Sequence, residues 1–365
     1  MPGLSQRSLS ILAIYSFSGA VMDYTLDQFM LLPPMERTRL LLSHTQPASF
    51  FEEIGEGMTE RLLWYEKNYD ICYSYWDAGR RRYIGQKNNR VCRFCQKKKP
   101  EVTFNNDAHA IPNFLGNNSL FSYEECDCCN EIFSKLEDSF AKHIGLGRTL
   151  SEIKGKTKIP SYKSPSQRSR IDRDTQHFKI LDNISDPIVD LDLENKSLKI
   201  KETIQPYIPI FVYKALVKVA LSVMDSKTLL KCSATIDWVK NLSDNRFLNL
   251  GHLKGFQGFL PGANPFKKVA VFLVKRKESP NEEVPGLMLI LVTANYFFQI
   301  VIPGYVDDSA LCEKTVTLHP FPLPFPKELS ANMKYGVVDF SSCEIMEKTT
   351  RTHTMRFDGF EGPLP

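Results

Sequence analysis

The sequence predicts an α+β protein with a mainly helical N-terminal segment, a small cysteine-stapled module and a separate C-terminal α+β domain. Three observations predict it: apolar residues spaced three and four apart, two CxxC pairs that enclose a strand-like and a helix-like stretch, and many strand-like runs thereafter. We expect a helical segment over 1–79, the module over 80–150, a linker over 151–175 and the C-terminal domain over 176–365.

Composition and charge exclude several classes of protein. Among 365 residues, 24 phenylalanines are too many for a chain that is disordered over most of its length. Lys and Arg number 46 and Asp and Glu number 42, so the net charge of +4 is too small to identify a polyanionic partner. Nine cysteines, an odd number that includes two CxxC pairs, favour reduced thiols and a metal over a disulfide framework.

The N-terminal segment has a helical pattern over about 25–75. Its apolar stripe contains Phe50, Phe51, Ile54, Met58, Leu62 and Tyr65. The apolar run Ser8–Met22 fits a signal peptide, an overlong start ahead of Met22, or a buried strand or helix. Because no other apolar run approaches the ~20 residues of a membrane helix, we expect a cytoplasmic protein that is not inserted in the membrane.

Residues 151–175 are rich in Lys, Ser and Pro and have no sustained periodicity, which is typical of a solvated linker. Beyond them Pro209 is predicted to begin a helix with an apolar face, and a second helix follows. The face of the first contains Val212, Ala215, Leu216, Val219, Ala220 and Val223, and the second contains Leu229, Leu230, Ile236 and Val239. Strands are expected at 177–181, 188–201 with a turn at 194–196, 269–275, 287–293, 296–302 and 337–344.

Two cysteine pairs dominate the middle of the chain. Cys92 and Cys95 form one CxxC, and Cys126 and Cys129 form the other after 30 intervening residues. Each CxxC turn presents two sulfurs, so the four predict a closed tetrahedral Zn²⁺ site. Cys128 lies between Cys126 and Cys129, so it could replace one of them as a zinc ligand.

The residues between the pairs have the chemistry of an active site. The stretch Val102–Pro112 is predicted to be a strand and a turn, with Asp107 and His109 on one face because side chains alternate along a strand. Asn117 and Asn118 follow Gly116 in a loop. Asn130 is expected to begin a helix that Gly145 ends and whose apolar stripe is Ile132, Phe133, Leu136, Phe140 and Ile144.

In CRFC, DAHAIP, GNN and CDCCN the sequence resembles the HNH endonucleases, the ββα-metal nucleases, in the subgroup with two zinc-binding CxxC pairs. The resemblance covers residues 92 to about 145. It implies a general base at His109, the middle motif residue at Asn118 or its neighbour Asn117, and a metal-binding residue at Asn130. The family commonly has an acidic residue before the histidine, where this chain has Ala108, and Asp107 is the substitute ligand.

The resemblance implies hydrolysis of phosphodiester bonds. His109 would accept a proton from the attacking water, and Mg²⁺ or Mn²⁺ bound through Asp107 and Asn130 would stabilise the leaving oxygen.

His143 is expected to interact with the dipole at the end of the helix.

A basic stretch from Arg80 to Lys99 leads into the first cysteine pair and contains no acidic residue. We expect it to bind a nucleic-acid backbone rather than to be merely solvated, because it adjoins the predicted site. The residues assigned to this role are Arg80, Arg81, Arg82, Lys87, Arg90, Lys97, Lys98 and Lys99. Tyr83 either stacks on a base or packs within the protein.

The resemblance favours a metal-dependent HNH endonuclease that acts on nucleic acid, with DNA expected, and suggests a role in bacterial defence. The C-terminal domain would serve recognition or regulation through a homo-oligomer, an activating protein or a small molecule. The alternative from another class is a non-catalytic zinc-containing nucleic-acid-binding protein, which Ala108 supports. A purely structural interaction protein gains nothing from His109 and Asn130.

Overall fold

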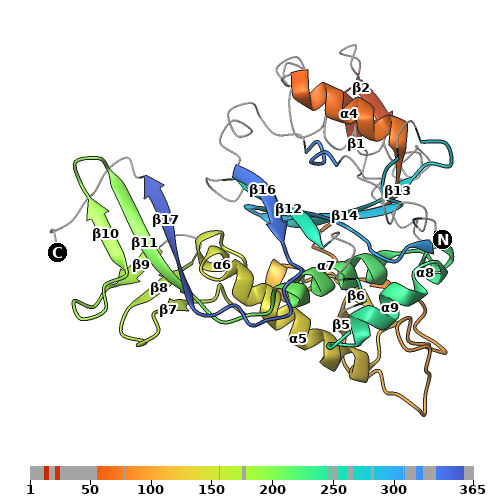
Figure 1. Ribbon diagram of the computed structural model, residues 1–365, viewed down its shortest axis with the longest axis horizontal. Helices are drawn as coiled ribbons and strands as arrows, with labels where there is room; N and C mark the ends of the chain where they lie inside the picture. The colour runs from red at the N-terminus through yellow and green to blue at the C-terminus, as the bar shows by residue number, and fades with distance from the viewer. Residues whose placement is uncertain are drawn as a thin grey trace, which may run out of the picture.

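The computed structural model describes residues 12–15, 21–24, 56–77, 79–155, 157–174, 178–244, 246–247, 253–260, 266–280, 283–306, 308, 318–323 and 334–356. In Figure 1 a central sheet has helix α4 on one side and helices α5, α7 and α9 on the other, and a smaller β lobe extends to the left. The mixed α+β class is confirmed. Within the described ranges, no helix combines the length and apolar character that crossing a membrane requires.

The central sheet has six antiparallel strands whose connections skip along the chain. Their spatial order is β16 (Lys334–Asp339), β12 (Lys254–Phe259), β15 (Tyr296–Val301), β14 (Leu287–Ala294), β13 (Phe266–Arg276) and β3 (Tyr69–Trp76). The strands expected at 269–275, 287–293 and 296–302 are β13, β14 and β15. The strand expected at 337–344 instead ends at Asp339, because the Asp339 carboxylate accepts from the backbone N–H and hydroxyl of Ser341 and turns the chain.

Both faces of this sheet are buried. Along β14, Leu289 and Leu291 belong to one hydrophobic cluster, whereas Ile290 and Val292 belong to a second one. All eight residues of β14 are buried, which explains why its sequence is continuously apolar rather than alternating. The first cluster continues into the cysteine module and helix α7, and the second is closed by α4.

Besides α5 (Asp127–Ile144), four helices of the described residues lie around the sheet. They are α4 (Glu56–Asn68), α7 (Pro209–Val223), α8 (Ser226–Leu230) and α9 (Ser233–Lys240). Helix α7 begins at Pro209 as expected, and nearly all of its residues are buried, including Lys214 and Lys218. The single helix expected next is divided at residues 231–232, and its Leu230 is 80% exposed.

The N-terminal segment differs from the helical expectation beyond Asn68. Tyr69, Ile71 and Tyr75 alternate with polar residues and form β3, which pairs with β13 from the C-terminal region. This alternating segment therefore forms a strand because it can pair with β13, which is distant in the sequence. Phe50, Phe51 and Ile54 lie outside the described residues, whereas β1 (Leu12–Tyr15) and β2 (Val21–Tyr24), which overlap the run Ser8–Met22, form a two-stranded hairpin.

The cysteine module packs directly on α7 through its helix α5 (Asp127–Ile144), beside which α7 runs in Figure 1. Arg93, which lies between the first two cysteines, is only 7% exposed. Its Nη1 donates to the carbonyls of Leu221 and Ser222, both at 2.6 Å, near the C-terminal end of α7. A cation at a helix C-terminus satisfies carbonyls that have no partner within the helix. The predicted division into domains stays a prediction, but these two parts share one core.

The smaller lobe consists of two three-stranded sheets. One contains β7 (Tyr162–Lys163), β8 (Arg170–Arg173) and β9 (Phe178–Leu181), and the other β10 (Val189–Asp192), β11 (Ser197–Ile204) and β17 (Thr349–Arg356). Strands β10 and β11 and the turn between them match the expectation for 188–201. The segment 151–175, expected to be a solvated linker, instead contributes β7 and β8, and Ile171 is fully buried in the core of this lobe.

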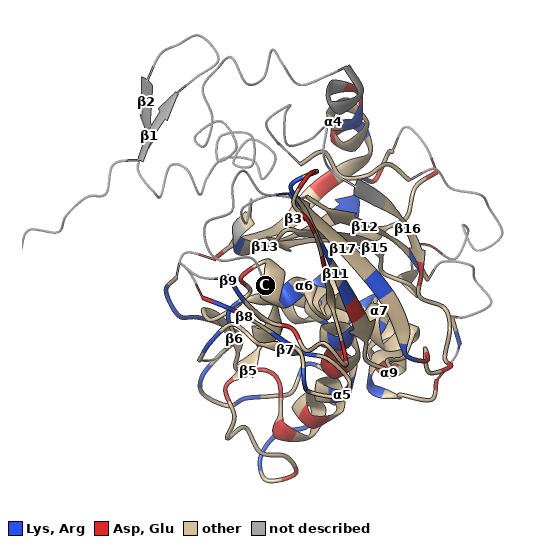
Figure 2. Ribbon diagram, turned by 90° about the vertical axis from the view of Figure 1, so that its left-hand side faces the viewer, with Lys and Arg blue, Asp and Glu red and all other residues tan. Residues whose placement is uncertain are grey.

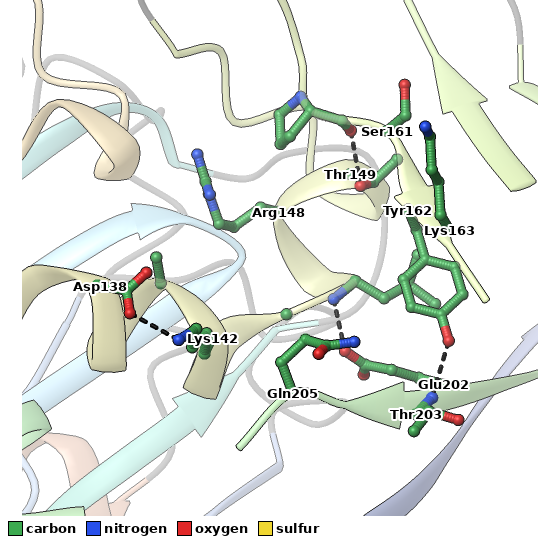
Figure 3. Close-up of a pocket in the computed structure, with 14 residues that line it drawn as sticks. Asp138, Lys142, Arg148, Thr149, Ser161, Tyr162, Lys163, Glu202, Thr203 and Gln205 are labelled. Carbon is green, nitrogen blue, oxygen red and sulfur yellow. Dashed lines mark hydrogen bonds and ion pairs between the residues drawn. The ribbon is translucent and has the colours of Figure 1, made fainter. Parts of the chain in front are cut away.

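Helix α5 and α6 (Gly147–Leu150) meet the smaller lobe at a pocket of about 290 Å³, shown in Figure 3. Its charged lining is largely paired within the protein: Lys142 contacts Asp138 at 2.7 Å, and Glu202 accepts from the N–H of Leu146 at 2.6 Å.

Near this junction His143 is buried between Tyr207 and Gln257. Burial lowers the pKa of His143 to about 4, so it is a neutral hydrogen-bonded group and not the cation expected at the helix dipole.

Gly145 ends α5 as predicted, with φ 59° and ψ −129°. A Cβ at this position would overlap the carboxylate of Glu202. We expect Gly145→Ala to lower the free energy of unfolding by about 1–3 kcal/mol from backbone strain alone. Urea denaturation measures this change. The control is Gly336→Ala, where a Cβ meets nothing within 4 Å, and equal stability of the two variants would contradict the prediction.

Candidate active site

The four cysteine sulfurs of the two CxxC pairs converge on one point. All four lie within 4.8 Å of one another, with Cys92 and Cys129 3.7 Å apart and Cys95 and Cys126 also 3.7 Å apart. A tetrahedron with Zn–S bonds of ~2.3 Å has sulfurs separated by ~3.8 Å, so this donor set fits a structural zinc ion. Cys128 is exposed and lies outside the cluster, which resolves the fourth ligand in favour of Cys129.

Backbone geometry places these sulfurs. The N–H of Cys92 donates to the carbonyl of Lys97, which closes the first turn, and Cys126 is the N-terminal cap residue of α5. Cys129 therefore follows within the first turn of the helix. The contact between the sulfurs of Cys129 and Cys92 lowers the pKa of Cys92 and raises that of Cys129, so binding of zinc by all four thiolates would release protons from this cluster.

A small sheet lies next to the cysteines. It has the order β4 (Arg82–Ile84), β6 (Leu120–Ser122), β5 (Ala108–His109). The short helix η1 (Asn113–Leu115) and a loop connect β5 to β6. Asn117 is fully buried in this loop: its amide donates to the carbonyls of Ile111 and Leu120, and its oxygen accepts from the N–H of Leu120.

The two asparagines that fit the middle motif thus have different environments. Asn117 holds the connection between β5 and β6, whereas Asn118 is exposed and accepts from the side chain of Asn113 at 2.7 Å. A fully hydrogen-bonded buried amide fixes the backbone around it. The structure therefore brings Asn117, rather than Asn118, into the position that shapes the hairpin, and the role assigned to Asn118 stays a prediction.

His109 is half-buried on β5 and rests against the Phe121 ring at a centroid distance of 4.6 Å. Ala108 is 2% exposed and points into the module, whereas Asp107 is exposed. The Asp107 carboxylate lies 3.7 Å from the Arg81 guanidinium, which itself covers the Phe121 ring at 5.1 Å. His109 and Arg81 therefore both contact the buried Phe121 ring, and Asp107 lies next to Arg81 at the surface.

The strand expected over Val102–Pro112 is reduced to Ala108–His109. The reason is the Asp127 carboxylate, which accepts the backbone N–H groups of Asn105 and Asn106 that a longer strand would use. This contact ties the segment before His109 to the first turn of α5, where Asn130 is partly exposed. Helix α5 itself has the expected apolar stripe, with Phe133, Leu136, Phe140 and Ile144 buried.

The basic stretch divides into exposed and structural residues. Arg80, Arg81, Arg82, Lys87, Lys97, Lys98 and Lys99 are exposed. Arg90 donates to the carbonyl of Phe104 and covers the Tyr123 ring, so part of its side chain is committed to the fold. Tyr83 stacks on Tyr123 at 4.3 Å and on Phe121, which identifies the packing role. Figure 2 shows basic residues recurring in the loops beside β5 and β6.

Sequence reasoning missed a buried charge beneath the site. Lys218 of α7 is 1% exposed, and its ammonium donates to the carbonyl of His109 at 2.7 Å. It also faces the buried Glu125 at 3.2 Å. Burial raises the pKa of Glu125 to about 7 against the opposing effect of Lys218. The signal in the sequence is a pair of lysines, Lys214 and Lys218, in an apolar helix without any acidic residue.

In the part of the chain that is described, the cysteines are the only group of three or more His, Cys, Asp or Glu side chains whose ligand atoms lie close enough together to hold a metal ion. A second, catalytic metal would therefore depend on a mixed set with an amide ligand. Asp107 and Asn130 offer hard oxygen donors of the kind that Mg²⁺ and Mn²⁺ prefer, and both are accessible to solvent.

Residues 92–144 match the family model described as HNH endonuclease. The match begins at the first cysteine of the cluster and ends at the last residue of α5, so it covers the cysteine cluster, β5, β6 and α5, whereas β4 and the first part of the basic stretch lie before it. No curated protein and no solved structure matches the chain significantly.

Cys95→Ser should abolish binding of one zinc ion and lower the melting temperature, because a site of four thiolates loses a ligand and metal binding is coupled to folding of the module. Metal analysis and thermal denaturation measure the two effects. Cys128→Ser is the matched control, since this exposed thiol lies outside the cluster and should retain zinc and stability. Full zinc content in the Cys95 variant would contradict the assignment.

Proposed function

Because residues 92–144 match the HNH endonuclease family, we propose that this protein is a metal-dependent endonuclease that hydrolyses phosphodiester bonds of DNA. The observation that carries the proposal is the contact of His109 and Arg81 with Phe121, with Asp107 next to Arg81, in the module that also contains the four-cysteine cluster. A base, a carboxylate and a cation in one exposed place are the groups that phosphodiester hydrolysis needs.

His109 is proposed as the general base. Its ring is half-buried against Phe121, which restricts its orientation, yet it remains accessible to water. A neutral imidazole at this position accepts a proton from the water that attacks phosphorus in line with the leaving oxygen. The hairpin fixed by Asn117 and the clamp of Asp127 on residues 105–106 hold the backbone on both sides of His109.

Asp107 and Asn130 are proposed to hold the catalytic Mg²⁺ or Mn²⁺. When bound, such an ion stabilises charge on the scissile phosphate and the leaving oxygen. Alternation along the chain supports the use of Asp107, because the intervening Ala108 is buried while Asp107 and His109 face outward. Arg81 keeps a loose contact of 3.7 Å with Asp107 and is exposed, so its guanidinium can turn to a phosphate oxygen.

The test of catalysis is cleavage of plasmid DNA with Mg²⁺ or Mn²⁺. His109→Ala should lose the base and slow cleavage by about 10²- to 10⁴-fold, while zinc content and DNA binding remain. Asp107→Ala should require more metal for half-maximal cleavage, and excess metal should partly restore the rate, because one oxygen ligand is removed while the base remains.

Asp138→Ala is the matched control for Asp107, since Asp138 is another exposed carboxylate of the module, paired only with Lys142. A normal rate for His109→Ala would refute the proposed mechanism. An unaltered metal dependence for Asp107→Ala would remove that residue from the metal site. Binding of DNA without cleavage by the wild type would favour the alternative, a non-catalytic nucleic-acid-binding module, and parallel assays with RNA test the choice of substrate.

The exposed arginines are proposed to bind the backbone without reading sequence. Neutral replacement of Arg80, Arg81 and Arg82 together should weaken DNA binding equally for unrelated sequences. The slope of log K against log salt should become shallower by about 0.9 for each phosphate that the protein no longer neutralises. A titration at several salt concentrations measures this slope. Neutral replacement of Lys196, Lys199 and Lys201 on the smaller lobe makes the same change in charge and should leave the slope unaltered.

A further inference from the structure

Strand β5 is an edge strand of only two residues, which leaves one side of its backbone without a sheet partner. On the paired side, His109 is opposite Phe121 of β6. On the other side the carbonyl of His109 points to α7, where it accepts a hydrogen bond from Lys218 at 2.7 Å. A buried carbonyl without a donor is costly, so this bond replaces the strand that is missing.

The Lys218 ammonium contacts three oxygens. Besides the carbonyl of His109, it contacts Glu125 at 3.2 Å and Glu137 at 3.5 Å. The first oxygen belongs to β5, Glu125 directly precedes Cys126, and Glu137 lies in the middle of α5. The ammonium also lies over the ring of Phe133, a residue of the hydrophobic core, 5.7 Å from the ring centroid.

We infer that Lys218 is a positioning residue for His109, which extends the proposed function and rests on it. The lysine does not touch substrate. It fixes the distance of β5 from α7 and the direction of the strand, so that the imidazole keeps one orientation against Phe121. The C-terminal region thereby supplies a part of the nuclease site that the matched residues 92–144 do not contain.

A purely structural role predicts a different result from a positioning role, and the chain offers a matched control. Lys214 lies one turn earlier in α7 and is equally buried, but it donates to the carbonyls of Asn241 and Asp244, away from the cysteine module. Lys214→Met therefore reports the general effect of removing a buried lysine from α7. Only replacement of Lys218 should alter His109.

Lys218→Met alone leaves Glu125 buried without a cation, which is strongly destabilising. The informative variant is therefore the pair Lys218→Met with Glu125→Gln, which removes the two fully buried charges and leaves the partly exposed Glu137. Glu125→Gln alone keeps the bond between Lys218 and His109 and should cleave DNA within about threefold of the wild-type rate.

The experiment uses the zinc-loaded full chain and two measurements. In cleavage of plasmid DNA, the double variant should lose about 10- to 100-fold in kcat with KM changed less than about threefold, since a shift of about 1 Å in a catalytic group has an effect of this size. In NMR spectra of imidazole-labelled protein, the His109 ring signal, identified by its absence in His109→Gln, should shift or broaden in the double variant alone.

Normal kcat and an unchanged His109 ring signal in the double variant would overturn the inference. So would the same change in Lys214→Met or in Glu125→Gln. If the wild type cleaves no nucleic acid while the ring signal changes as expected, the positioning role stands and the proposed function fails. The two claims therefore fail in different measurements.

Discussion

The convergence of four sulfurs on one point is the constraint on which the rest of the site depends. The sulfurs 3.7 Å apart connect the turn at Cys92 to the first turn of α5. Once these are joined, Asp127 can reach the segment before His109, and Glu125 can reach Lys218. A module this small has little core of its own, so a metal ion is an effective way to hold it.

The module is nevertheless not self-sufficient. Arg93 of the module donates to a carbonyl at the end of α7, and Lys218 of α7 donates to a carbonyl of β5. Each part thus supplies one cation that binds the backbone of the other. Burial would lower the pKa of Lys218, but Glu125 and Glu137 raise it above its ordinary value, and it stays charged. Buried charges of this kind specify one docking geometry, because any other leaves them unpaired.

The part of the site that could be predicted from sequence is the part encoded locally. The spacing of the cysteines predicted the cluster, and the pattern after Cys129 predicted α5 and its end at Gly145. The length of β5 and the burial of Lys218 depend on partners outside the local pattern. The partner of Lys218 lies 109 residues away, and no periodicity reports such a contact. Strand β3 was missed for the same reason, since its pairing partner β13 is remote.

The central claim is that one module contains a structural zinc and, beside His109, a separate catalytic metal. Anomalous diffraction from crystals soaked in Mn²⁺ with a DNA oligonucleotide tests it most directly. The account predicts a zinc peak among Cys92, Cys95, Cys126 and Cys129, and a manganese peak beside Asp107 and Asn130. A manganese peak elsewhere, or bound DNA with no manganese next to His109, would contradict it.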